Sequence, residues 1–307
     1  MFSFYKHRKV FIGVSLAIIV IGLILSFTFG INLDIQFRGG SIITYQYVGD
    51  LSLQDAEDTA EEALGQNVTA QMTESVVDDR TTLIISVAGN EALLPAEMEA
   101  LSDALTKSFP DLNVRLVSSD LVAPFIGREM LTNGILAILV SSVLIIIYVW
   151  FSFRSISGPS AGVMALIALL HDVTIAFFVF VAMRTPLNET LVAVVLTILG
   201  FSINDTIVVY DRIRENVRLT NGSMPLDELV DMSIRQSLTR SINTSVATFS
   251  AVAVAFIFAT IFGIDSIAEF ALPLMVGIIA GAYSSLALAS PLWVAWKTRG
   301  GRTGYEA

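Results

Sequence analysis

Six long apolar segments constrain the fold of this chain more than any other feature. Each holds about 20 mainly apolar residues, the length that an α-helix needs to cross a bilayer. The segments are 10–29, 131–153, 161–183, 187–210, 246–262 and 268–296. Backbone groups in lipid must bond to one another, and no alternating barrel pattern is present, so we predict a polytopic α-helical membrane protein with six transmembrane helices. A composition of 54% hydrophobic and 15% charged residues agrees with this class.

The first apolar segment has the charge order of a signal peptide, because Lys6-His7-Arg8-Lys9 precedes it. It is longer than the roughly 7–15 apolar residues of a cleaved signal, and 26–30 is a poor cleavage site. We therefore expect it to be retained, with residues 1–30 forming the N-terminus and transmembrane helix 1.

Lysine and arginine mark the cytoplasmic side of a membrane protein. Twelve of the 18 basic residues lie in the N-terminus, the loop at Arg154, the segment 211–240 and the tail 297–307. With helices 2–6 in 131–296, these four segments share one side, so we expect both termini in the cytoplasm. The loop 31–130 then lies outside, with 17 acidic and five basic residues.

The outer loop is long enough for one domain. Strands are expected at 41–48, 68–73, 81–87 and 114–119, and helices at 53–64 and 95–109. The order β-α-β-β-α-β, with a turn at Asp78-Asp79, predicts a ferredoxin-like α+β extracytoplasmic domain between helices 1 and 2. It contains no histidine, cysteine or glycine-rich phosphate loop that would indicate catalysis. We interpret its acidic surface as ordinary solvation, with a docking face for a partner as the alternative.

Ionisable side chains inside the apolar segments are the candidate functional residues, because a charge there costs about 2.5–3.5 kcal/mol on insertion scales. Asp205, beside Asn204, lies 18 residues along the fourth segment, in its cytoplasmic half. Arg240 enters from the cytoplasmic side just before a polar stretch that includes Thr244. We predict that Asp205 and Arg240 can meet, and that proton uptake by the carboxylate can separate them. An inert ion pair between two helices is the structural alternative.

His171 and Asp172 lie near the middle of the third segment. They could extend a proton relay toward the far side of the membrane, or form a satisfied hydrogen bond inside the bundle. The spacing of Gly277 and Gly281 in the sixth segment predicts close helix packing rather than a site.

The segment between helices 4 and 5 carries the signals of a separate helix. Ser223 is placed as an N-cap, Pro225 and two acids follow, and apolar residues then recur at helical spacing up to Ile234. We expect an amphipathic helix in the membrane interface, distinct from the fifth span.

Several motifs are specific enough to indicate a family. They lie at 37–40, 169–172, 200–216, 236–245, 283–285 and 290–292. These motifs, and the whole length of the chain, resemble the SecF family, the smaller membrane subunits of SecDF protein-export complexes, which are related to RND-type proton-driven exporters. The family usually has an aspartate where Gln36 stands here, with Asp34 two residues earlier. This departure weakens a role for Gly39-Gly40 as a hinge, and we interpret that pair as a turn with positive φ.

The resemblance implies an RND-like half-unit in the cytoplasmic (inner) membrane that promotes Sec-dependent translocation of unfolded proteins. Its implied partners are SecD, which supplies a further intramembrane aspartate, and the SecYEG channel. Asp205 is then the proton carrier and Arg240 its counter-charge, and movement of the outer domains pulls the translocating chain outward. The supporting polar groups are Asn204, Asp172, His171 and Thr244.

Composition and spacing argue against other functions. The chain has no cysteine and two histidines, which excludes thiolate sites, and neither a metal site nor another cofactor is expected. A net charge of −10 argues against a nucleic-acid partner. One alternative is a stand-alone RND-type exporter of small hydrophobic molecules, although such pumps usually carry twice as many helices. Another is an intramembrane aspartyl protease, but Asp172 and Asp205 are offset by about 9 Å along the helix axes.

Overall fold

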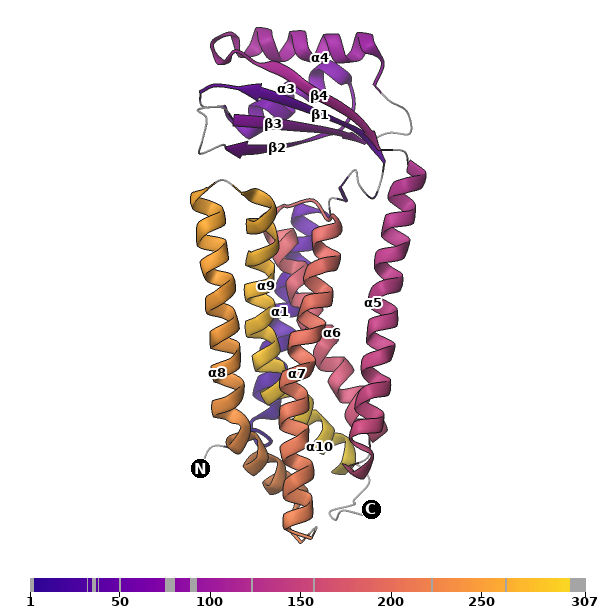
Figure 1. The fold of residues 1–307 in the computed structure, drawn as a ribbon, viewed down its shortest axis with the longest axis vertical. Helices are drawn as coiled ribbons and strands as arrows, with labels where there is room; N and C mark the ends of the chain where they lie inside the picture. Colours follow the sequence, from indigo (N-terminus) through magenta and orange to yellow (C-terminus); the bar gives the residue numbers. More distant parts are fainter. Residues whose placement is uncertain are drawn as a thin grey trace.

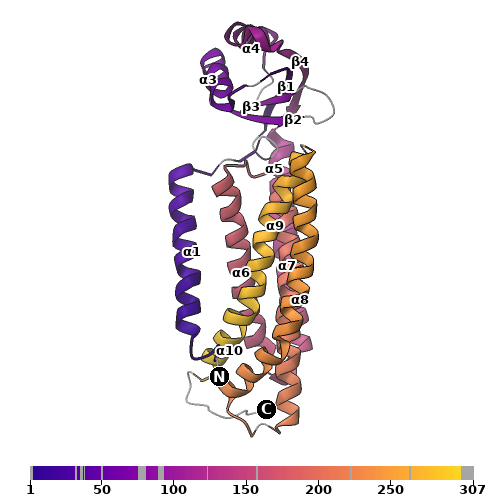
Figure 2. The ribbon, with the colours of Figure 1, turned by 90° about the vertical axis from the view of Figure 1, so that its left-hand side faces the viewer.

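The computed structural model describes a helical bundle with a small α+β domain at one end (Figure 1). The described residues are 3–31, 33–34, 37, 39–49, 51–74, 81–88, 93–122, 124–156, 158–221, 223–262 and 264–298. Helix α1 starts, and α10 ends, at the end of the bundle away from this domain (Figure 2). The long axis of the bundle is the direction in which the apolar helices can cross a membrane.

Within the described part of the chain, six helical segments are long and apolar enough to span a bilayer, as predicted. They are α1 (Arg8–Phe29), α5 (Pro124–Ser152), α6 (Gly158–Met183), α7 (Glu189–Leu219), α8 (Leu226–Ile261), and α9 (Asp265–Ser284) with its continuation into α10 (Ser290–Thr298). A π-helical turn, Ser285–Ala289, joins α9 to α10. Proline at 273 lies inside α9 and does not end it.

Helix α8 differs from the prediction of two separate elements. It runs without a break for 36 residues, so the expected interfacial helix and the fifth span are one helix. No proline or glycine interrupts it, and the apolar face formed by Leu229, Val230 and Ile234 is buried in the main core of the protein instead of in lipid. The predicted serine cap is also wrong: Pro225 is the N-cap residue, and the Ser223 hydroxyl donates to the Thr220 carbonyl oxygen at 2.7 Å.

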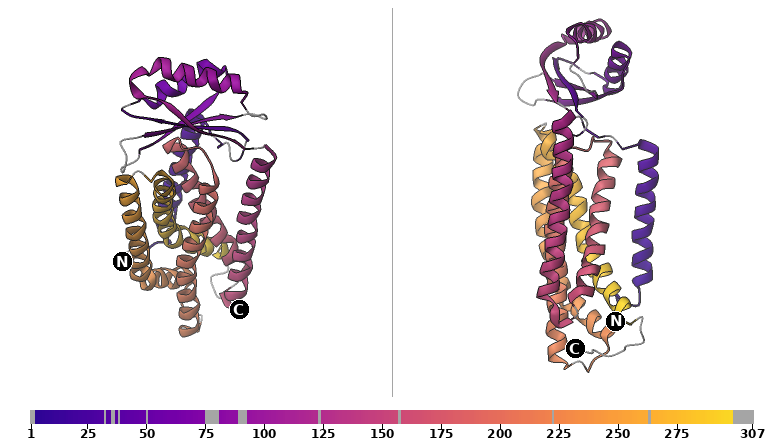
Figure 3. Two further views of the ribbon diagram at one scale, coloured as in Figure 1. Left: turned by 45° about the horizontal axis from the view of Figure 1, so that its top comes forward. Right: turned by 90° about the vertical axis from the view of Figure 1, so that its right-hand side faces the viewer.

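The domain between α1 and α5 has the predicted element order, with boundaries shifted by at most three residues. Its elements are β1 (Gly40–Tyr47), α3 (Leu53–Leu64), β2 (Val68–Glu74), β3 (Thr81–Ala88), α4 (Pro95–Ser108), a 3-10 turn (Pro110–Leu112) and β4 (Arg115–Val122). The strands form one antiparallel sheet in the order β2-β3-β1-β4, and both helices lie on the same face of it (Figure 3). This sheet is consistent with the expected ferredoxin-like unit. The predicted turn at 78–79 lies outside the described residues.

Alternating side chains of the strands form the core of this domain. Ile43, Tyr45 and Tyr47 of β1 are buried at every second position, as expected for one covered face of a sheet. Leu101 and Leu105 of α4, one turn apart, are completely buried against them. The strand side chains at every second position and the helix side chains four residues apart therefore pack into a single apolar layer.

The connection from α1 to the domain is docked on the bundle. Leu33 forms a parallel β-bridge with Leu187 in the α6–α7 loop, and the Asp34 amide donates to the Leu187 carbonyl oxygen at 3.0 Å. Gly39 and Gly40 have φ values of 82° and 148°, which confirms the turn with positive φ. Position 36, where the departure from the family was noted, lies outside the described residues.

Helices α6, α7 and α9 form the centre of the bundle, and α1, α5 and α8 lie around it. The apolar windows of α6 and α7 are 56% and 50% buried, against 11% for α1 and α5 and 6% for α8. Close approach of α9 to α7 depends on glycine, as predicted: a Cβ at Gly281 would lie 3.1 Å from the Ser202 Cβ, and one at Gly277 would overlap Ile198.

Candidate functional site

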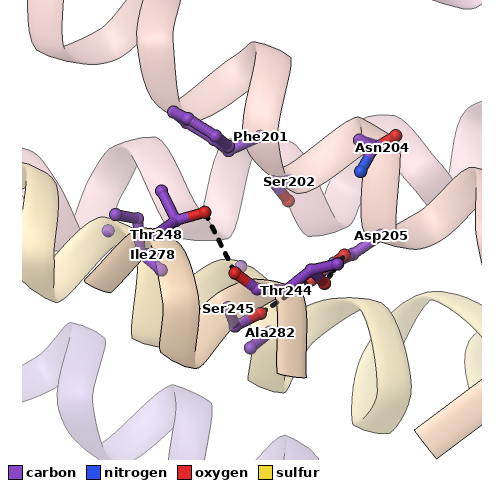
Figure 4. Close-up of a pocket in the computed structure, with 11 residues that line it drawn as sticks. Phe201, Ser202, Asn204, Asp205, Thr244, Ser245, Thr248, Ile278 and Ala282 are labelled. Atoms are coloured by element: carbon purple, nitrogen blue, oxygen red, sulfur yellow. Dashed lines mark hydrogen bonds between the residues drawn. The ribbon is translucent and has the colours of Figure 1, made fainter. Parts of the chain in front are cut away.

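A pocket of about 200 Å³ lies between α7, α8 and α9 within the membrane-spanning part of the bundle (Figure 4). Its lining is mostly hydroxyls, an amide and small or apolar side chains. The residues are Phe201, Ser202, Asn204, Asp205, Thr244, Ser245, Thr248, Gly277, Ile278, Gly281 and Ala282. Asp205 is the one titratable side chain in this lining, and the volume is sufficient for several water molecules.

Asp205 is held by hydroxyl groups of α8. The Ser245 hydroxyl donates to Asp205 Oδ2 at 3.0 Å, and the Thr244 hydroxyl lies 3.4 Å from Oδ1. Figure 4 shows these side chains facing one another across the α7–α8 contact. Asp205 as a whole is 7% exposed. An ionised Asp205 is thus stabilised by the neutral Ser245 hydroxyl, with the Thr244 hydroxyl nearby, instead of by a positive charge.

Arg240 does not pair with Asp205 among the described residues, in contrast to the contact considered from the sequence. Its carbonyl oxygen accepts the Thr244 hydroxyl at 3.0 Å, so Arg240 lies one turn earlier on α8, about 6 Å along the axis from the level of Asp205. The arginine is exposed on the outer face of the bundle.

Asp172, near the middle of α6, is another carboxylate in the bundle and is completely buried. Its Oδ2 accepts the Ser202 hydroxyl of α7 at 2.5 Å and the Ser284 hydroxyl of α9 at 2.7 Å. Its Oδ1 lies 2.9 Å from Nδ1 of His171. Three helices therefore converge on one carboxylate, and the His171–Asp172 hydrogen bond, one of the two alternatives considered from the sequence, is present.

Ser202 connects the two carboxylate environments. Its side chain lines the Asp205 pocket, while its hydroxyl is committed to Asp172. Its carbonyl oxygen accepts the hydroxyls of Thr206 and Ser285, each at 3.2 Å. Among the described residues no hydrogen bond joins Asp172 directly to Asp205.

The π-helical turn places two consecutive serines on different partners. Ser284 reaches Asp172 of α6, and Ser285 lies 2.9 Å from the Thr206 hydroxyl of α7. A π turn widens the helix by one residue per turn and is frequent at functional sites. The polar residues of α6, α7 and α9 are therefore joined by hydrogen bonds inside an apolar bundle.

The two carboxylates could be predicted from the sequence, but most of the hydroxyl groups that bond to them could not. Ser245 and Ser284 were not singled out, although a hydroxyl inside an apolar segment was the signal available. Asn204 lines the pocket but is exposed on the outer face of α7. Within the described residues, no group of three or more histidine, cysteine or acidic side chains is placed to hold a metal ion.

Fold and site together define a class: a multi-pass membrane protein with six apolar helices, one small sheet domain and buried carboxylates in the bundle. Residues 101–299 match the family described as protein export membrane protein SecD/SecF, C-terminal. The chain belongs to the SecD/SecF family.

Curated relatives cover nearly the full length of the chain. It is 33% identical over 305 residues to the protein translocase subunit SecF of Petrotoga mobilis, covering 98% of each chain. It is 35% identical over 292 residues to the protein translocase subunit SecDF of Brucella abortus, covering 95% of this chain and 36% of that protein.

A solved structure has the same fold. The crystal structure of SecDF, a translocon-associated membrane protein from Thermus thermophilus, superposes with a TM-score of 0.79 at 30% identity. The superposition covers 97% of this chain and 39% of that one. The chain thus corresponds to one part of the longer SecDF proteins and to nearly all of a SecF protein.

Proposed function

We propose that this chain is an accessory subunit of Sec-dependent protein translocation that uses the proton-motive force. Its relatives are named protein translocase subunits, and its fold is that of a translocon-associated membrane protein. The observation that carries the proton-coupling part of the proposal is Asp205, a carboxyl group in a pocket within the span, bound by hydroxyls and without a paired cation among the described residues.

Proton binding at Asp205 would change how α7 and α8 are held together. Hydrogen bonds to an ionised carboxylate are roughly twice as strong as those between neutral groups. When Asp205 takes up a proton, the hydrogen bond from Ser245 becomes one between neutral groups, and one carboxyl oxygen becomes a donor. The α7–α8 contact is thereby weakened at the level of the pocket, and release of the proton restores it.

The exposed polar face of α7 and α8 supports a partner bundle. Arg240, Asn243 and Thr244 on α8 and Asn204 on α7 are all exposed, and such groups are not stable against lipid. We propose that SecD covers this face and supplies a carboxylate for Arg240. In the relatives named SecDF, the matched region is about a third of a longer chain, which leaves sequence for such a bundle.

We propose that the protein lies in the cytoplasmic (inner) membrane with both termini in the cytoplasm. The α+β domain then lies outside, where a polypeptide leaving the SecYEG channel would emerge. The changes at Asp205 would be transmitted to this domain and would favour outward movement of the unfolded chain.

The decisive experiment replaces Asp205 by Asn, which keeps the shape and removes the titrating group. Vesicles containing the chain with SecD and SecYEG would be assayed for export of a secretory protein, with and without a proton gradient. We expect Asp205→Asn to lose the gradient-dependent part of export. Asp211→Asn, the same change at the exposed end of the same helix, should retain it. Wild-type stimulation of the Asp205→Asn variant by the gradient would refute the coupling role.

A further inference from the structure

Another pocket lies on the face of α7 opposite Asn204. Its volume is about 330 Å³, and it is bordered by α5, α6 and α7 together with the connection that follows α1. Eleven of its twelve lining residues are apolar, and the other is Thr174. One of them is Val195, which is nine residues, or two and a half turns, away from Asn204 on α7. The face that we assign to SecD therefore leaves this pocket uncovered.

Water is a poor occupant for this pocket. A bound water needs two to four polar partners, and Thr174 is the one polar side chain in the lining. Its hydroxyl already donates to the Leu170 carbonyl oxygen at 2.7 Å. The helices around the pocket are all apolar enough to span a bilayer, so we expect an apolar occupant drawn from the membrane.

The pocket is too narrow for another transmembrane helix. Leu131, Ile135 and Ile138 line it over two turns of α5, or about 10 Å along the axis. At this level α5 is in direct contact with α7, because a Cβ at Gly134 would lie 2.8 Å from Val192 Cγ2. Packed helices keep their axes about 8–10 Å apart, so no helix fits between the two. A single acyl chain can lie along such an apolar slot without separating them.

Arg128 places a positive charge at the end of this slot nearest the α+β domain. It precedes Ile135 by seven residues, or two turns, so the two side chains lie on the same face of α5. Arg128 is exposed, and its side chain forms no ion pair with the described residues. Its acidic neighbour Glu129 is turned about 100° away around the helix axis. A guanidinium group matches the geometry of a phosphate group.

We propose that this pocket is a phospholipid-binding site. One acyl chain lies along Leu131, Ile135 and Ile138, the phosphate group lies at Arg128, and the second acyl chain stays in the bilayer. Basic side chains beside transmembrane helices bind lipid headgroups in this way. The site does not depend on the function proposed above, and the orientation proposed there puts it in the outer leaflet.

Lipid binding can be counted by native mass spectrometry of the full-length chain, purified in detergent and stripped of lipid. Two probes with the same acyl chains are titrated separately: phosphatidylglycerol, which carries a phosphate, and diacylglycerol, which does not. We expect the first phosphatidylglycerol to bind at least about tenfold more tightly than the second. It should also bind about fivefold more tightly than diacylglycerol, which is the effect of one arginine on an anionic headgroup.

The headgroup contact is tested by a matched pair of arginine variants. Arg128→Gln should make phosphatidylglycerol and diacylglycerol bind equally, because the cation at the end of the slot is lost. Arg184 provides the control: it is also exposed and lies in the α6–α7 loop, where its guanidinium covers the Phe29 ring of α1 at 4.3 Å. Arg184→Gln should keep the roughly fivefold preference for phosphatidylglycerol.

The acyl-chain contact is tested by filling the pocket. Ile135 and Leu136 are 50% and 55% exposed, but of the two Ile135 lines the pocket. Ile135→Trp should weaken binding of the first phosphatidylglycerol by about tenfold, because the indole and the acyl chain compete for one space. Leu136→Trp makes the same change on a different face of α5 and should leave that affinity unchanged.

The wild-type chain alone can refute the site, without any variant needing to fold. Phosphatidylglycerol molecules that bind in a continuous series with no preferred first one would overturn it, and so would equal affinity for diacylglycerol. A dimer that Ile135→Trp dissociates would show that protein covers the pocket and would also overturn the proposal. None of these results bears on the export experiment with Asp205→Asn, so the two proposals can fail separately.

Discussion

The close contact between α7 and α9 at Gly281 allows a quantitative test of the packing. A Cβ at position 281 would lie 3.1 Å from Ser202 Cβ and 3.4 Å from Ser202 Cα. The position of Ser202 Cβ is set by its backbone, so a change of rotamer cannot relieve the contact. Gly281→Ala must therefore push α9 and α7 apart by a few tenths of an ångström, at the level where Ser202 and Ser284 both reach Asp172.

The expected cost follows from two opposing effects. Overpacking of this kind costs about 1–3 kcal/mol, whereas replacing glycine by alanine inside a helix gains about 1 kcal/mol. Gly281→Ala should thus lose between about 0 and about 2 kcal/mol. Gly200 provides the control, because it lies inside α7 and a Cβ there would meet nothing within 4 Å. Gly200→Ala should gain about 1 kcal/mol.

The two variants should therefore differ by about 1–3 kcal/mol, with Gly281→Ala the less stable. At roughly 2 °C per kcal/mol for a chain of this size, the apparent Tm values in detergent should differ by about 2–6 °C. Thermal unfolding followed by tryptophan fluorescence measures this difference. Equal shifts of the same sign in both variants would refute the reasoning that Gly281 is required by close helix approach.

Two further predictions concern other parts of the molecule. Burial, with a contribution from neighbouring carboxylates, raises the pKa of Glu57 in α3 above its unfolded value. Glu57→Gln should therefore raise the Tm at about pH 7, and this gain should vanish as the pH falls below about 4. Thermal unfolding at both pH values would show the difference. Asp231 is buried in α8 and accepts the Ser3 hydroxyl and the Tyr5 amide. Asp231→Ala should destabilise this contact by about 1–3 kcal/mol, so amide exchange of residues 3–7 should accelerate while that of β1 stays unchanged.

Local signals in the outer domain were sufficient to predict its elements. Helix α3 begins and ends where expected because both of its ends have capping residues. The Ser52 side chain accepts the Asp55 amide at the start, and Gly65 follows the helix with a φ of 64°. The strands were predicted within three residues because one face of the sheet is buried and the alternation of β1 is regular.

The contacts inside the bundle could not be predicted in the same way. Ser202 and Ser284 are 30 and 112 residues from Asp172, and their meeting depends on the rotation of three helices and on the π turn. The apolar face of residues 226–234 fits a lipid interface as well as a protein core, so its pattern could not distinguish the two. Arg240 is exposed because of the way α8 is rotated about its axis. That rotation depends on whether the apolar face of residues 226–234 packs on protein or on lipid, which the sequence could not decide.

The two connections of the outer domain differ in how they contact the bundle. The first is fixed to the α6–α7 loop by the Leu33–Leu187 bridge and by the Asp34 amide. The second is α5, which begins two residues after β4 ends and whose apolar window is only 11% buried. We therefore expect the sheet to tilt about the contact at Leu187, and we expect α5 to tilt with it because that helix follows β4 directly.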